Sequence, residues 1–280
     1  MPDLLEETDD ASLAVCIAGV DATIRGPHSV VAVLERTLVH AHRSRGEAHE
    51  RTSIRITKDD FVWQISGRSA RSMKALSASS VEPQVAGAVV SALISDASEA
   101  AGLCVWRAAV VERDGEAVAF VGDDWESALV LAAHLQARGW RLLGGDYALI
   151  DRSTLTALGT RKLLYVTLSV VDELPLSYRR AVEASPWYST QHDIAFYAVD
   201  PTMGGRPNVW ADRAKLRAVL KVDGNVGEFP SLERTGAFVA GDGIGSDELE
   251  RRGVAVAEVR LGDYAETTDL VQRWYRSLPE

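Results

Sequence analysis

Closely spaced cysteines and long apolar runs are both missing from this 280-residue chain. Cys16 and Cys104 are the only cysteines, so they offer no metal-ligand spacing and indicate a reduced, cytoplasmic setting. No apolar run approaches the length of a membrane span, and the amino-terminal MPDLLEETDDAS has no signal-peptide core. We therefore expect a cytoplasmic protein without a membrane partner.

An excess of positive charge is missing too. The chain has 30 Lys and Arg residues against 40 Asp and Glu residues, which gives a formal net charge of -10. This balance argues against nucleic acid and against anionic membranes as partners, because both would be repelled. A basic peptide or protein is still compatible with it.

The length allows one large domain or two small ones. Residues 1–11 are acidic and predict a disordered tail. Residues 12–101 combine strand-like alternation with helical periodicity and predict a small N-terminal α+β region, ending in a helix from about Glu82 to Ala101. Strands alternate with helices over residues 102–280, which predicts a layered α/β core.

The segment AFVGDDWESALVLAAHLQARGWRLLGGDYALID, residues 119–151, predicts a strand, a tight turn at Gly122, a helix and a second strand. This order is typical of a phosphate-binding loop, in which backbone N–H groups and a lysine hold the phosphates. Here the turn contains Asp123, Asp124 and Glu126 and has no lysine. The segment thus has the frame of a nucleotide site with carboxylates at its mouth.

The stretches RAAVVERDGEAVAFVG and ALVLAAHLQARGWRLLGGDYALID together resemble the HPr kinase/phosphorylase-like family. The resemblance is to the HPr-kinase-related proteins of modified-peptide gene clusters in particular. It is close over about residues 102–151 and extends to the rest of the chain only in element order. It implies an HPr-kinase/PEP-carboxykinase-like P-loop core at residues 102–280, and a setting in modified-peptide biosynthesis.

The resemblance also implies which residues form the cofactor-binding loop. Gly122 corresponds to the first glycine of the family's loop, and Asp123, Asp124 and Ser127 follow it in a loop about two residues short. The family's Gly-Lys-Ser/Thr ending, which neutralises phosphates and holds Mg²⁺, is absent. The loop is therefore interpreted as degenerate.

Two further family positions differ. Active relatives carry a histidine where this chain has Arg107, and an acidic pair where it has Gly145 and Asp146. With the lysine, the histidine and one acid missing, we expect Mg-ATP phosphoryl transfer to be lost and no cofactor to be needed. Asp146 is the candidate catalytic residue if activity is retained, and no metal site is predicted.

The acidic turn also has purely structural explanations. Asp124 can cap the following helix with Ser127 at the third position, and nearby carboxylates favour the positive end of a helix. The alternatives are a site for a cation or basic peptide, and phosphate binding through backbone amides alone. Arg107 is expected on an interior strand, paired with Asp146 or Asp124, since buried charges need partners, and the alternative is anion binding.

Three functions are compatible with these residues. The leading hypothesis is an HPr-kinase-like pseudokinase that recruits a peptide or protein partner. The second is a repurposed enzyme that uses Asp123, Asp124, Glu126 and Asp146 as acid/base or metal groups. The third is an active ATP-dependent serine kinase in which Lys162 or Arg161 replaces the missing charge. The oligomeric state is not predicted.

Overall fold

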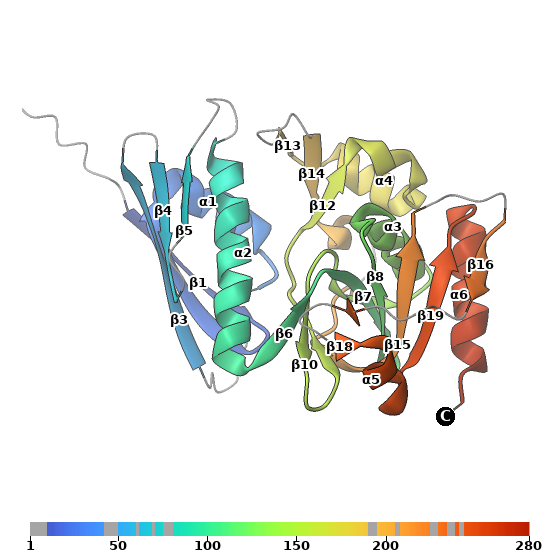
Figure 1. Ribbon diagram of the computed structural model, residues 1–280. Coiled ribbons are helices and arrows are strands. Elements are labelled where there is room, and N and C mark those ends of the chain that lie inside the picture. Colours follow the sequence, from blue (N-terminus) through green and yellow to red (C-terminus); the bar gives the residue numbers. More distant parts are fainter. Residues whose placement is uncertain are drawn as a thin grey trace, which may run out of the picture. The chain divides into compact units, whose positions relative to one another are not determined.

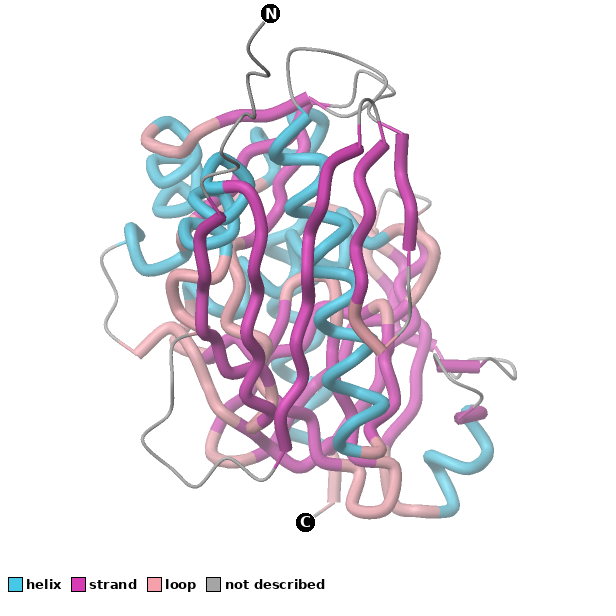
Figure 2. Tube along the Cα trace, turned by 90° about the vertical axis from the view of Figure 1, so that its left-hand side faces the viewer, coloured by secondary structure: helices cyan, strands magenta, loops and turns pink. Residues whose placement is uncertain are grey.

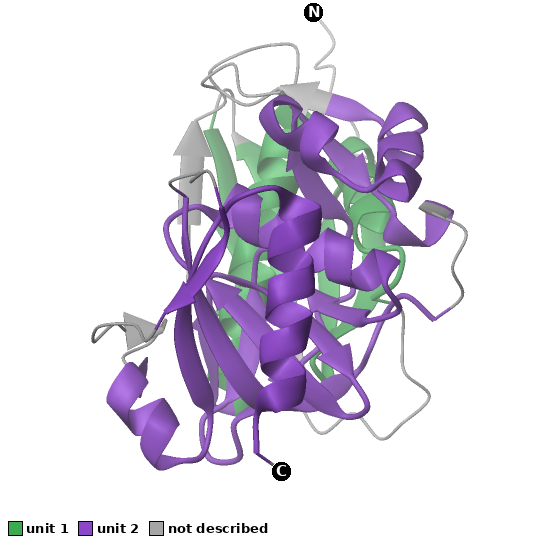
Figure 3. Cartoon of the chain, turned by 90° about the vertical axis from the view of Figure 1, so that its right-hand side faces the viewer, with its two compact units in different colours: residues 1–101, 188–194 green, residues 102–187, 195–280 purple. Residues whose placement is uncertain are grey.

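The computed structural model describes residues 10–41, 50–59, 62–68, 71–74, 81–189, 195–204, 208–224, 229–233, 239–240 and 244–279. The chain divides into two compact units, coloured separately in Figure 3. Unit 1 comprises residues 1–101 and 188–194, and unit 2 comprises residues 102–187 and 195–280.

Unit 1 is a five-stranded sheet covered on one face by two helices. Its strands lie in sequence order and are β1 (Asp10–Ile17), β2 (Val20–Pro27), β3 (Glu50–Asp59), β4 (Val62–Ser66) and β5 (Arg71–Lys74). The β2–β3 pair is parallel and the other pairs are antiparallel. The helices α1 (His28–Thr37) and α2 (Val81–Ala101) lie behind this sheet in Figure 2.

Strand alternation separates the two faces of the unit 1 sheet. Val15, Ile24 and Ile54 are fully or almost fully buried on the helix-covered face, whereas their sequence neighbours reach solvent. β1 begins at Asp10, so Asp10 and Ala11 belong to a strand and not to the tail predicted for residues 1–11. Residues 1–9 lie outside the described part of the chain.

Unit 2 is built on a nine-stranded mixed sheet. Seven strands follow the order β6-β10-β11-β15-β8-β7-β9, and β19 pairs with β15 and with β16. The β8–β15 and β15–β19 pairs are parallel and the remaining pairs are antiparallel. The strands are β6 (Leu103–Trp106), β7 (Ala108–Arg113), β8 (Glu116–Val121), β9 (Arg141–Gly144), β10 (Ala148–Asp151), β11 (Thr156–Leu158), β15 (Arg213–Asp223), β16 (Ser231–Glu233) and β19 (Ala255–Arg260).

Helices cover both faces of this sheet (Figure 1). On one face, α3 (Trp125–Ala137) and α6 (Tyr264–Ser277) share a core with Val111 and Phe120. On the other face, α5 (Ser246–Arg251) shares a core with Val110 and Ala119. β7 and β8 are thus buried on both sides, which is why they read as near-continuous apolar runs.

A smaller group of elements lies between β11 and β15 in the chain. It consists of the sheet β12-β14-β13 and three short helices, with β12 (Leu164–Thr167), η1 (Leu168–Glu173), α4 (Leu176–Glu183), β13 (Trp187–Ser189), β14 (Ala195–Val199) and η2 (Pro201–Gly204). The short hairpin β17 (Val239–Ala240) and β18 (Ile244–Gly245) precedes α5.

The mixed α/β class predicted from the sequence is confirmed. Within the described ranges, no helix is both long enough and apolar enough to cross a membrane.

Candidate functional site

The candidate site lies where the parallel strands β8 and β15 end. Val121 pairs with Lys221, and Gly122 follows β8 while Gly224 follows β15. Gly122 has φ +143°, and a Cβ there would lie 2.7 Å from the carbonyl oxygen of Val222. Glycine is therefore required at this turn by the close approach of the two strands.

Asp124 caps α3, as the sequence predicted. Its carboxylate accepts hydrogen bonds from the Ser127 backbone N–H at 3.1 Å and from the Ser127 hydroxyl at 2.6 Å. The same carboxylate lies against Gly224, where a Cβ would be 2.6 Å from Asp124 Oδ2. The N-terminus of α3, which would face a phosphate in a P-loop protein, is thus occupied by the chain's own carboxylate.

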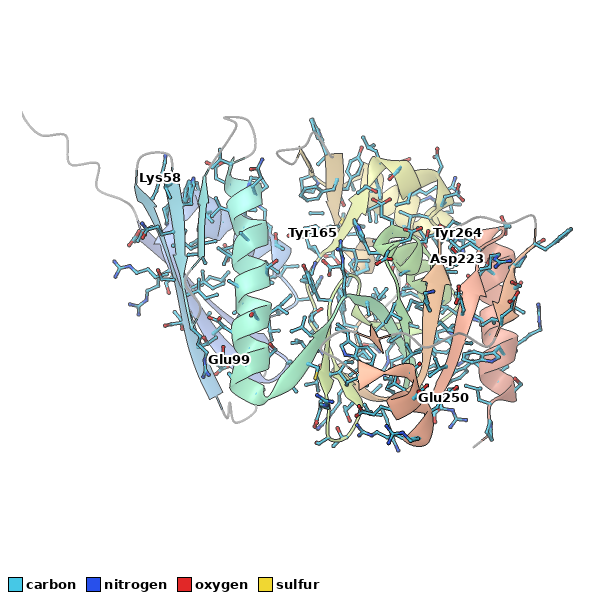
Figure 4. The ribbon with its side chains drawn as sticks, viewed as in Figure 1. Lys58, Glu99, Tyr165, Asp223, Glu250 and Tyr264 are labelled. Carbon is cyan, nitrogen blue, oxygen red and sulfur yellow. The ribbon has the colours of Figure 1, made fainter. Side chains whose placement is uncertain are left out.

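Ser127 also connects the loop to the last helix. Its hydroxyl is 2.8 Å from the Tyr264 hydroxyl, and this contact is buried. Tyr264, labelled in Figure 4, stacks on His134 with ring centroids 6.1 Å apart. Burial raises the pKa of the Tyr264 phenol, and Asp124 adds to this effect. Tyr264 therefore stays neutral and can donate or accept a hydrogen bond here at physiological pH.

Glu126 ties the start of α3 to η1. Its two carboxylate oxygens accept hydrogen bonds from Thr167 Oγ1 at 2.6 Å and from Ser169 Oγ at 3.1 Å. At the other end of η1, His134 Nε2 lies 2.8 Å from the Glu173 carbonyl oxygen, so this nitrogen carries the proton. η1 therefore runs along α3. Of the three carboxylates in the turn, Asp123 is the exposed one.

Arg107 does not form the predicted ion pair. It lies between β6 and β7, its side chain is exposed, and its guanidinium carbon is 6.0 Å from the centroid of the Trp125 ring. The prediction is wrong because the strand is interrupted at this residue, which lets the guanidinium reach water and an aromatic face. Asp146, its expected partner, pairs with a different cation.

That cation is Lys162, whose Nζ lies 2.8 Å from Asp146 Oδ2. Lys162 is only 1% exposed, and its Nζ is 4.2 Å from the centroid of the Tyr165 ring, which Figure 4 labels. Burial alone would lower the pKa of the Lys162 ammonium, but the Asp146 carboxylate, together with the phenols of Tyr165 and Tyr147, outweighs burial and the pKa is raised. Lys162 is therefore charged and held inside the unit.

The second oxygen of Asp146 is the least satisfied group of the site. Asp146 Oδ1 is buried and has no hydrogen-bond partner among the described residues. Gly145, beside it, is packed so that a Cβ would clash with Leu164 and lie 3.2 Å from Leu129 Cδ1. A second carboxylate at this position, as the resemblance would require for an active site, has no room unless Leu164 moves.

The structure thus brings Gly122, Asp124, Ser127 and Glu126 together around the start of α3. A Cβ on Gly145 would lie 3.2 Å from Leu129 of that helix, whereas the Arg107 guanidinium lies over the Trp125 ring and forms no ion pair with Asp146. Sequence reasoning missed Tyr264, Thr167 and Ser169 as partners of this loop because they lie far away along the chain and belong to no motif. In the described part of the chain, no three His, Cys, Asp or Glu side chains are grouped to hold a metal ion.

Comparison with known proteins adds little to this geometry. No family model matches the chain, and no curated protein matches it. Among solved structures, the HPr(Ser) kinase/phosphatase from Coxiella burnetii is similar over 61% of this chain and 95% of that chain, at 11% identity and a TM-score of 0.31. A TM-score of this size carries no argument, so the proposals below depend on the contacts within the chain.

Proposed function

We propose that this chain is an HPr-kinase-like pseudokinase that binds a peptide or protein partner and transfers no phosphate. The observation that carries the proposal is the carboxylate of Asp124 at the N-terminus of α3, hydrogen-bonded to Ser127. A phosphate bound to these backbone amides would have to displace that carboxylate. A carboxylate about 5 Å from a phosphate costs about 0.8 kcal/mol even at the dielectric constant of water.

The positions of the nearby cations support the same proposal. Lys162, a candidate to replace the missing loop lysine, is buried in its ion pair with Asp146. Arg161, the other candidate, pairs with Asp212. Releasing Lys162 toward a nucleotide would leave Asp146 as a partly buried carboxylate without a counter-charge, which is strongly unfavourable.

The rim of the degenerate loop suits a basic partner with an apolar side chain. Asp123, Asp172 and Glu173 are exposed, and Leu168 is 57% exposed beside Thr167. Asp123 lies at the start of α3, and Leu168, Asp172 and Glu173 lie on η1, which Glu126 and His134 hold beside that helix. Exposed carboxylates attract Lys and Arg side chains, while an exposed leucine offers an apolar anchor.

The resemblance to proteins of modified-peptide gene clusters suggests that the partner is a precursor peptide or an enzyme that acts on one. A precursor-peptide gene beside the gene for this chain is the expected arrangement. Its product would be the first natural ligand to test.

Selection of peptides from a random display library against the immobilised chain tests the proposal. We expect enrichment of peptides that combine Lys or Arg with an apolar residue. The Asp123→Asn/Asp172→Asn variant should bind them at least tenfold more weakly, whereas Asp247→Asn, an exposed carboxylate on α5, should not change binding. A lack of enriched peptides, or equal binding by all variants, would contradict the proposal.

A second candidate function is favoured by the buried, unpartnered Oδ1 of Asp146 beside Lys162. A carboxylate poised in this way suits proton transfer in a repurposed enzyme. Hydrolysis of Mg-ATP that is abolished in Asp146→Asn would support this function. Absence of turnover in the unaltered protein would leave the binding function as the better account.

A further inference from the structure

The outer face of the unit 1 sheet places two arginines side by side in a row of polar residues. Ser12 pairs with Arg25 across β1 and β2, Arg25 pairs with Arg55 across β2 and β3, and Arg55 pairs with Ser66 across β3 and β4. All four side chains are exposed, on the face opposite the helices. Figure 2 looks onto this face.

In the described part of the chain, no carboxylate forms an ion pair with either arginine. Neither guanidinium has an ion pair or a hydrogen bond there, although carboxylates outnumber basic side chains in the sequence by 40 to 30. Asp10, opposite Pro27, lines the same groove as the two arginines and forms an ion pair with neither. Adjacent strands are about 4.8 Å apart, so the two like charges repel each other across the β2–β3 pair.

The arginines line a groove with hydroxyl groups around them. The groove has a volume of about 710 Å³, and its lining includes Ser12, Thr23, Ser53 and Ser66 as well as Arg25 and Arg55. Guanidinium groups bind the oxygens of a phosphate in pairs, and hydroxyls can donate further hydrogen bonds to the same oxygens. A phosphate monoester carries a charge of about -1.5 to -2 at pH 7. This charge balances two guanidinium groups better than the single negative charge of a carboxylate ligand would.

We propose that this row of residues, Ser12, Arg25, Arg55 and Ser66, is a binding site for a phosphoryl group. The ligand is either a small phosphorylated molecule or a phosphorylated side chain of a peptide. The site belongs to unit 1 alone and does not depend on the function proposed for the loop of unit 2.

Amide chemical-shift mapping on the unaltered protein tests the site without any substitution. Inorganic pyrophosphate and a phosphoserine peptide are titrated separately, at constant ionic strength set with chloride. We expect shifts centred on the amides of residues 12, 23, 25, 53, 55 and 66. Tighter binding of pyrophosphate would identify a small-molecule site, and tighter binding of the peptide would identify a phosphoprotein site. Shifts confined to residues outside unit 1, or none with either probe, would overturn the proposal.

Substitution of the arginines supplies a second readout. Arg25→Gln/Arg55→Gln should weaken binding of the better probe at least tenfold, while Arg213→Gln, an exposed strand arginine of unit 2, should leave it unchanged. Without ligand, the double variant should unfold at the same temperature as the unaltered protein or a higher one, because the like-charge repulsion is removed. Undiminished binding by the double variant would overturn the proposal.

Discussion

At the residue scale, three carboxylates of one short turn have three different environments. Asp124 caps α3, Glu126 accepts hydrogen bonds from Thr167 and Ser169, and Asp123 is exposed. The capping role could be predicted from the sequence, because Asp124 and Ser127 have the spacing of an N-cap and its third helical position. The partners of Glu126 could not, since they are more than forty residues away along the chain.

Asp124→Ala should destabilise unit 2 by about 1 kcal/mol, because it removes the side-chain cap of α3. Asp123→Ala is the matched control, since it removes an exposed carboxylate from the same turn and should change the free energy of unfolding by less than about 0.5 kcal/mol. Urea denaturation followed by circular dichroism measures both. Equal stability of the two variants would show that the cap contributes nothing.

Lys162→Met should destabilise the protein by about 3–5 kcal/mol, because it leaves Asp146 without its counter-charge. The double variant Lys162→Met/Asp146→Leu should regain part of this loss, since neither charge is then left alone. Urea denaturation of the two variants decides the point. A double variant less stable than Lys162→Met would contradict the account of the pair.

The same pair predicts a dependence on pH. The pKa of Lys162 is higher in the folded chain than in the unfolded chain, so its contribution to stability is complete below the unfolded pKa of about 10.4. The contribution is lost as the pH rises from there through the folded pKa. The stability difference between the unaltered protein and Lys162→Met should therefore be constant from pH 7 to 9 and shrink above pH 10.4. A difference that grows with pH would contradict the raised pKa.

At the scale of elements, a helix or turn with a strong local sequence pattern could be predicted, whereas a strand without such a pattern could not. The helix expected from about Glu82 to Ala101 is α2. The turn between β7 and β8 is also encoded locally, because Asp114 and Gly115 adopt the positive φ that an Asp-Gly pair favours. β5 has no comparable local signal, because the sequence RSARSMKALSASS is polar and its strand is defined only by pairing with β4. α5 begins after Gly245, which supplies no side-chain cap.

Thr167→Val should loosen η1 without unfolding the unit. It removes the 2.6 Å hydrogen bond to Glu126, one of the contacts that hold η1 along α3. Amide hydrogen exchange in residues 168–173 should become faster, while exchange in β8 and β15 should not change. Thr57→Val, an exposed threonine of unit 1, serves as the control. Unchanged exchange in residues 168–173 would show that η1 is held by its other contacts.

At the scale of the whole molecule, charge is distributed in a way that the net value of -10 conceals. The turn before α3 in unit 2 carries exposed or capping carboxylates, whereas the outer sheet face of unit 1 carries Arg25 and Arg55, which form no ion pair with any described residue. The sequence indicated the first feature through its acidic run. It could not indicate the second, because the two arginines become neighbours only through the register of a parallel strand pair.

The central claim is that the start of α3 no longer binds nucleotide, and calorimetric titration with Mg-ATP tests it most directly. The titration uses the Arg25→Gln/Arg55→Gln variant, so that phosphate binding on unit 1 does not contribute heat. The account predicts no saturable binding at millimolar Mg-ATP and no release of phosphate. Saturable binding of Mg-ATP, with or without phosphate transfer or hydrolysis, would contradict it.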